Sequence, residues 1–133
     1  MTLTVKSGDK VTAIYKTGKY IGEVTAVNPT SIVIRILAVI KHPVQGDLHH
    51  PKQLGEGFFH ERKALAYREQ ANIPAGMVKP FQESIPEYGE SLIVAFNTLK
   101  AQLQEDHTPF AEHSLAALAE IQKEYELMYN LSF

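Results

Sequence analysis

Cysteine is absent from all 133 residues. The chain therefore has no disulfide, no thiolate zinc site, no thiol nucleophile and no acylated cysteine. This composition suits a reducing compartment, and we expect the protein in the cytoplasm.

Long hydrophobic runs are also missing. The longest apolar run, residues 36–40, is far too short to span a bilayer. Residues 1–10 show no basic segment followed by an apolar one, so we predict no signal peptide. We expect no direct membrane anchor in this chain.

Charge is present but unevenly distributed. The net charge is −2, yet residues 1–80 carry 11 Lys or Arg against 6 Asp or Glu, and residues 81–133 carry 2 against 9. Such a split fits a nucleic-acid face, an acidic protein partner, or attraction between the two halves of the chain. The sequence leaves these three explanations open.

The first part of the chain has the pattern of a small β-sheet. Runs of β-branched and aromatic residues predict strands at 11–15, 20–27 and 32–40, and residues 64–68 alternate as a strand would, although a helical turn also fits them. Gly18 is expected to supply a positive φ in the first turn, and Gly22 a bend or bulge. We predict an SH3-like antiparallel β-barrel over residues 1–74, because closure removes exposed edges.

A long loop interrupts this pattern at residues 41–57. Prolines and glycines exclude regular structure there: Pro43, Gly46, Pro51, Gly55 and Gly57. Loops of this length in a compact domain are usually functional or mobile.

Residues 75–133 are predicted to form a helical hairpin packed on the barrel, with helices at about 86–104 and 109–129. The first is expected to start with Ser84 or Ile85 at the N-cap and Pro86 in its first turn, and the second with Thr108 at the cap. Apolar residues recur every three or four positions: Tyr88, Leu92, Ala95, Phe96, Leu99 and Leu103, then Leu115, Leu118, Ile121, Tyr125 and Met128. The predicted fold class is α+β.

The polar residues are compatible with three kinds of chemistry. A histidine-rich group has the right atoms for zinc but no known ligand spacing: His42, Asp47, His49, His50, His60 and Glu61. Catalysis by His60, with Glu61 or Asp47 orienting it, lacks a nucleophile, and no phosphate-binding glycine motif is present. Nucleic-acid binding would use a basic and aromatic set: Lys10, Tyr15, Lys16, Lys19, Tyr20, Arg62, Lys63 and Arg68.

We predict no catalytic residue, no cofactor and no metal, and keep metal binding and nucleic-acid binding as alternatives. Polar residues in and after the long loop are the candidates for binding a partner, because polar loops on a rigid scaffold make good recognition surfaces. They are Lys41, His42, Gln45, Asp47, His49, His60, Arg62, Arg68 and Glu69.

Several segments resemble one known family. They are residues 15–24 (YKTGKYIGEV), 37–49 (LAVIKHPVQGDLH), 58–62 (FFHER), 64–70 (ALAYREQ), 85–88 (IPEY) and 90–92 (ESL). Together they are similar to the kinase-associated protein B family, also called kinase-associated lipoprotein B, of Bacillus-type spore formers. The resemblance covers nearly the whole chain.

The resemblance implies a non-enzymatic accessory protein that acts with a sensor histidine kinase, or a linked phosphorelay protein, in the sporulation phosphorelay. It also implies an SH3-like barrel followed by helices. The family name mentions a lipoprotein, whereas this sequence has no cysteine to carry a lipid. We therefore expect any location at the inner face of the membrane to depend on a partner.

Overall fold

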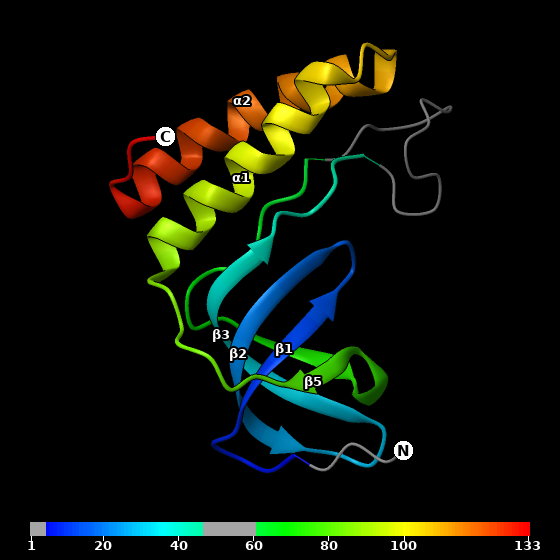
Figure 1. Ribbon diagram of the computed structural model, residues 1–133, viewed down its shortest axis with the longest axis vertical. Coiled ribbons are helices and arrows are strands. Elements are labelled where there is room, and N and C mark those ends of the chain that lie inside the picture. Colours follow the sequence, from blue (N-terminus) through cyan, green and yellow to red (C-terminus); the bar gives the residue numbers. More distant parts are fainter. Residues whose placement is uncertain (1–4, 47–60) are drawn as a thin grey trace.

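The computed structural model describes residues 5–46 and 61–133, in which an antiparallel sheet precedes two helices (Figure 1). Asp47, His49, His50 and His60 lie outside the described residues. The strands are β1 (Lys10–Tyr15), β2 (Gly18–Val27), β3 (Ser31–Lys41), β4 (Gln70–Pro74) and β5 (Val78–Pro80), and a single 3₁₀ turn, η1 (Ala75–Met77), joins the last two. The helices are α1 (Tyr88–Glu105) and α2 (Pro109–Tyr129). The predicted α+β class is confirmed.

The sheet has the strand order β4-β3-β2-β1-β5, and its pairs are antiparallel. This order leaves β4 and β5 as edges, so the predicted closed SH3-like barrel is not confirmed. β5 pairs with β1 and extends the sheet to Pro80, past the boundary expected at residue 74.

The strand predicted at 64–68 is wrong. Residues 61–66 have no regular structure, Tyr67 and Arg68 form a turn in which Arg68 has a φ of 68°, and β4 begins only at Gln70. The backbone groups of Ala64 and Leu65 bond tyrosine hydroxyls instead of a neighbouring strand.

Gly18 and Gly22 lie in β2, and only the prediction for Gly22 is confirmed. The positive φ expected at Gly18 occurs at Lys16 (54°), in the turn that Lys16 and Thr17 form. The bulge expected at Gly22 is confirmed by a register shift between β2 and β3. A Cβ at Gly22 would lie 2.6 Å from the Arg35 carbonyl oxygen, so the two strands approach too closely there for a side chain.

The helices lie side by side in opposite directions across one end of the sheet (Figure 1). α1 packs on β3, and the Ser91 hydroxyl accepts a hydrogen bond from the Val39 amide (3.0 Å). α1 starts later than predicted, because Glu87 rather than Ser84 or Ile85 is its N-cap. Thr108 caps α2 through a bond from the Ala111 amide, as predicted.

One core joins the sheet to both helices. Its most deeply buried side chains include Tyr20, Ile34, Ile36, Ile73, Leu92, Phe96, Leu118, Ile121 and Tyr125. Most of the residues in the two predicted apolar helix faces are buried or partly buried. Met128 is 57% exposed, so its assignment to the apolar face of α2 is wrong.

Candidate partner-binding site

The structure divides the predicted recognition residues into exposed and buried ones. Lys41, Arg68 and Glu69 are exposed, and Arg62 is half-buried. His42 and Gln45 are only 1% and 2% exposed. These last two were assigned to an exposed surface, and that assignment is wrong; both hold the interior together.

Gln45 joins the two chain segments that flank residues 47–60. Its Nε2 donates to the carbonyl oxygens of Arg62 (2.7 Å) and Pro43 (3.1 Å), and its Oε1 accepts from the Arg62 amide (2.8 Å). The Arg62 Nε donates to the Gly46 carbonyl (2.8 Å). A buried amide that satisfies both backbone groups of one residue substitutes for a strand pair at this point.

His42 makes one hydrogen bond with each ring nitrogen. Its Nδ1 lies 3.0 Å from the Pro43 carbonyl oxygen and its Nε2 lies 2.9 Å from the Tyr125 hydroxyl. A carbonyl only accepts, so Nδ1 carries the hydrogen and Nε2 accepts from the hydroxyl. Burial lowers the pKa of His42 to about 4, which keeps the ring neutral at pH 7.

Three tyrosine hydroxyls, from β2, α1 and α2, bind the backbone of Ala64 and Leu65. The Tyr125 hydroxyl accepts from the Ala64 amide (2.7 Å), and the Tyr20 hydroxyl accepts from the Leu65 amide (3.2 Å). The Tyr88 hydroxyl donates to the Leu65 carbonyl. We call these three groups the hydroxyl cluster. They hold a segment without regular structure against both layers of the fold.

The hydroxyl cluster stays protonated at neutral pH. Burial raises the pKa of Tyr20 to about 12, and burial also raises the pKa values of Tyr88 and Tyr125. These hydroxyls are therefore hydrogen-bonding groups rather than nucleophiles or bases.

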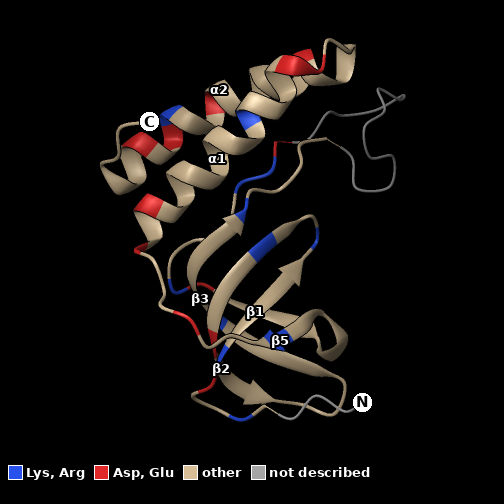
Figure 2. Ribbon diagram, in the orientation of Figure 1, with Lys and Arg blue, Asp and Glu red and all other residues tan. Residues whose placement is uncertain are grey.

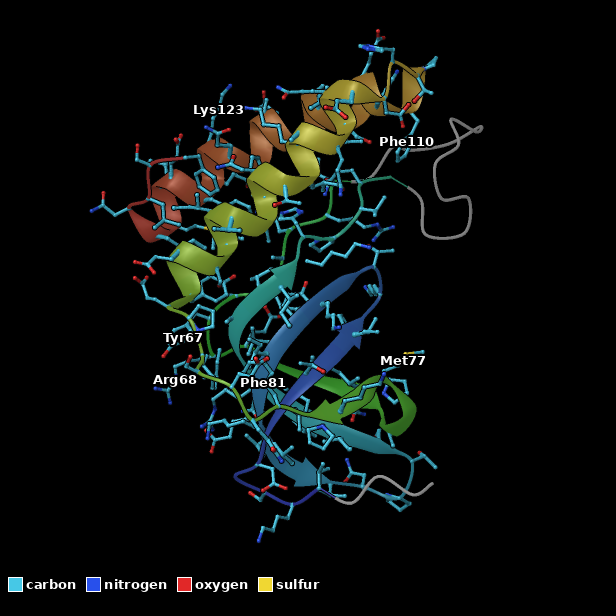
Figure 3. The ribbon with its side chains drawn as sticks, viewed as in Figure 1. Tyr67, Arg68, Met77, Phe81, Phe110 and Lys123 are labelled. Atoms are coloured by element: carbon cyan, nitrogen blue, oxygen red, sulfur yellow. The ribbon has the colours of Figure 1, made fainter. Side chains whose placement is uncertain are left out.

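A pocket of about 430 Å³ opens beside this cluster, where the turn at residues 67–68, the linker into α1 and the end of α2 meet. We call it the tyrosine pocket, because Tyr67, Tyr88 and Tyr129 contribute rings to it, with centroids 5.7 Å apart for the first two and 5.4 Å for the last two. The other lining residues are Leu37, Ile85, Pro86, Glu87, Gly89 and Leu131. Tyr67 is 51% exposed, and Figure 3 shows it with Arg68 beside the linker that enters α1.

The described residues bear on both alternative functions, metal binding and nucleic-acid binding. No group of three or more His, Asp or Glu within residues 5–46 and 61–133 is placed to hold a metal ion, and both ring nitrogens of His42 are bonded. Of the residues considered for nucleic acid, Tyr20 is buried and Lys10 and Lys63 pair with Glu23 and Glu124.

Comparisons with known proteins place the chain in a family. A family model described as kinase associated protein B matches residues 15–126. The chain belongs to the kinase-associated protein B family. The resemblance noted in the sequence is thereby confirmed.

Two relatives within this family cover nearly the whole chain. Kinase-associated lipoprotein B of Bacillus subtilis (strain 168) is 52% identical over 122 residues, which are 92% of this chain and 95% of the relative. A crystal structure of kinase-associated protein B from Bacillus cereus superimposes with a TM-score of 0.80 at 49% identity, covering 92% of this chain and 99% of the other.

No helix in the described part of the chain is long and apolar enough to cross a membrane.

The tyrosine pocket was not found from the sequence, because Tyr67, Tyr88 and Tyr129 come from three separated segments. Tyr88 and Tyr129 lie at ends of the two helices, which was the available signal, and only the fold brings these ends together with Tyr67.

Proposed function

We propose that this protein is a non-enzymatic accessory factor that binds a sensor histidine kinase, or a protein linked to it, in the phosphorelay that leads to sporulation. The main support is its 52% identity to a protein named kinase-associated lipoprotein B, over 95% of that protein. The kinase association comes from that name and from the family description.

The lack of enzymatic activity is part of the proposal and is supported by the buried titratable groups that the structure describes. His42 and the hydroxyl cluster, whose pKa values are shifted by burial, all form hydrogen bonds with backbone groups or with each other. Perturbed pKa values often mark active sites, but structural networks produce them too. Here the bonding pattern favours the structural explanation.

The proposed mechanism is a shift in the active-state population of the kinase. Such a shift requires that the accessory protein bind two kinase states with different affinity. The exposed residues Lys41, Arg68 and Glu69 and the acidic helices are the surfaces available for this contact (Figure 2).

Two finer expectations belong to the same proposal. We interpret the sheet as an SH3-like barrel that is open between β4 and β5, because η1 joins these edge strands directly. We also place the protein in the cytoplasm, and at the inner face of the membrane when its partner lies there.

The test is the autophosphorylation rate of a purified, membrane-reconstituted sensor kinase, measured at increasing concentrations of the protein. We expect a rate that changes and then saturates as the binding sites fill. A rate that stays constant up to saturating protein contradicts direct action on the kinase. Protein heated to unfolding serves as the matched control.

A further inference from the structure

We propose that the tyrosine pocket binds the side chain of an arginine or lysine presented by a basic segment of a partner protein. This inference rests on the proposed function only for the identity of the partner. The chemistry of the segment follows from the pocket itself.

The walls of the pocket suit the long stem of a basic side chain. Leu37, Ile85, Pro86 and Leu131 provide apolar surface, and three tyrosine rings complete the lining. Lysine and arginine bury their methylene stems against such surfaces while the charged end stays near water or a counter-ion. A volume of about 430 Å³ leaves room for one such side chain and a neighbouring residue.

The pocket also offers partners for the positive charge. Glu87 is one of the lining residues, and the bond from the Gly89 amide to its Oε1 (3.2 Å) orients the carboxylate. Tyrosine faces attract a cation through the ring quadrupole, and a guanidinium stacks on them. A carboxylate beside several tyrosine rings is thus selective for a cation with an apolar stem.

The charges around the pocket favour the same occupant. Residues 81–133 carry nine acidic and two basic residues, and Figure 2 shows acidic residues where the linker enters α1. Glu90 lies in the first turn of α1, and Lys123 pairs with Glu120. Arg68, next to Tyr67 in sequence, is an exposed cation near this pocket, where Glu87 and Glu90 both carry negative charge. A negative field of this kind attracts basic segments.

Other occupants fit less well. An anionic ligand would face Glu87, which already bonds the Gly89 amide at the start of α1. A purely apolar side chain would gain no attraction from the Glu87 carboxylate, whereas a basic side chain would gain a charge-assisted contact.

The proposed test starts from a random peptide library displayed on phage and selected on the full-length protein. We expect the enriched peptides to share an Arg or Lys next to an apolar residue. One enriched peptide is then synthesised with its basic residue intact, with citrulline, which keeps the length but not the charge, and with norleucine, which keeps the stem alone. We expect each replacement to weaken binding by about tenfold, as measured by fluorescence polarisation.

Protein variants test the same contact from the other side. Glu87→Gln keeps the oxygen that accepts from the Gly89 amide but removes the charge, and Tyr67→Ala removes an exposed ring. Each is expected to weaken peptide binding by about tenfold. Met77→Ala is the matched control, because Met77 is 48% exposed and lies far from Tyr67 (Figure 3), and it should leave binding unchanged.

Several results would overturn the proposal. These are the absence of any enriched peptide, enrichment of acidic or wholly apolar peptides, equal binding of the norleucine peptide, or equal binding by Glu87→Gln. A wild-type dimer in sedimentation velocity that Glu87→Gln dissociates would assign the pocket to a second copy of this chain instead.

The kinase experiment separates this inference from the proposed function. Selective basic peptides together with no kinase binding would refute the proposed function and leave the pocket assignment intact. The opposite result is that the wild-type protein and Glu87→Gln bind the kinase equally and the phage selection enriches no basic peptide. That result would refute the pocket assignment and leave the proposed function intact.

Discussion

The Nε2 of His42 and the hydroxyl of Tyr125 lie 2.9 Å apart although 83 positions separate them in the chain. The same hydroxyl accepts from the Ala64 amide, so one oxygen connects the residue that follows β3, the C-terminal part of α2 and the segment that precedes β4. This connection explains why a histidine in a predicted recognition loop is buried. The imidazole is therefore part of the hydrogen-bonded interior rather than of an exposed surface.

Replacing Tyr125 by phenylalanine should lower the free energy of unfolding by about 2 to 4 kcal/mol. The change leaves His42 Nε2 and the Ala64 amide without a partner, and each unsatisfied buried group costs about 1 to 3 kcal/mol. Urea unfolding measures the difference. The half-exposed Tyr67 provides the control, since Tyr67→Phe should change stability by less than about 0.5 kcal/mol. Equal effects of the two substitutions would contradict the connection described here.

Stability should fall as the pH drops from 7 to 5. The pKa of His42 is lowered to about 4 in the folded protein, against about 6.5 in the unfolded chain, so the unfolded chain binds more protons between these values. The contribution of His42 is therefore complete above pH 6.5 and decreases toward pH 4, with a loss of about 2 kcal/mol by pH 5.

Urea titrations at pH 7, 6 and 5 test this dependence. His42→Gln has no group that titrates at this position, so the variant should be less stable at pH 7 but show a shallower slope between pH 7 and 5. Parallel slopes for wild type and variant would show that His42 does not cause the pH dependence.

Gln45→Ala should remove the side-chain hydrogen bonds that connect residues 43–46 to Arg62. Both backbone groups of Arg62 lose their partner, so we expect hydrogen exchange at the Arg62 amide to speed up by about tenfold or more. Amide exchange followed by NMR provides the measurement. Gln82→Ala, in the exposed linker before α1, should leave this rate as it is. An unchanged rate in Gln45→Ala would mean that the amide is protected by other contacts.

Two glycine substitutions should have opposite consequences. At Gly22 a methyl group would meet the Ile34 side chain and the Arg35 carbonyl oxygen, so Gly22→Ala should destabilise the protein by about 1 to 3 kcal/mol. No atom lies within 4 Å of the corresponding position at Gly76, where alanine should be neutral or stabilise by about 0.4 to 1 kcal/mol. Thermal unfolding of both variants distinguishes them. Similar melting temperatures would refute the close approach of β2 and β3.

The sequence predicted those features that depend on local periodicity. The strands around residues 11–15, 20–27 and 32–40 and the Thr108 cap follow from β-branched runs and from cap chemistry. Residues 64–68 alternate like a strand, but the backbone groups of Ala64 and Leu65 bond the hydroxyls of Tyr20, Tyr88 and Tyr125, and no local pattern contains that information.

The candidate site was less predictable than the fold. His42 and Gln45 are polar residues of a Pro/Gly-rich loop, which is typical of recognition residues. In the fold, His42 bonds Tyr125 of α2 and Gln45 bonds Arg62, and neither contact can be read from the local sequence. Among the predicted site residues that the structure describes, only Lys41, Arg68 and Glu69 are exposed. The tyrosine pocket combines the turn at residues 67–68, a linker and the end of α2, so it exists only once the sheet and the helices have packed together.

Affinity capture of the protein from a spore-former extract, with and without nuclease, tests the central claim most directly. Mass spectrometry should identify a sensor histidine kinase or another phosphorelay protein in both samples, and not in a capture with unrelated protein of similar charge. Recovery of ribosomal or nucleoid proteins alone, lost on nuclease treatment, would contradict the kinase association and indicate a nucleic-acid-binding protein.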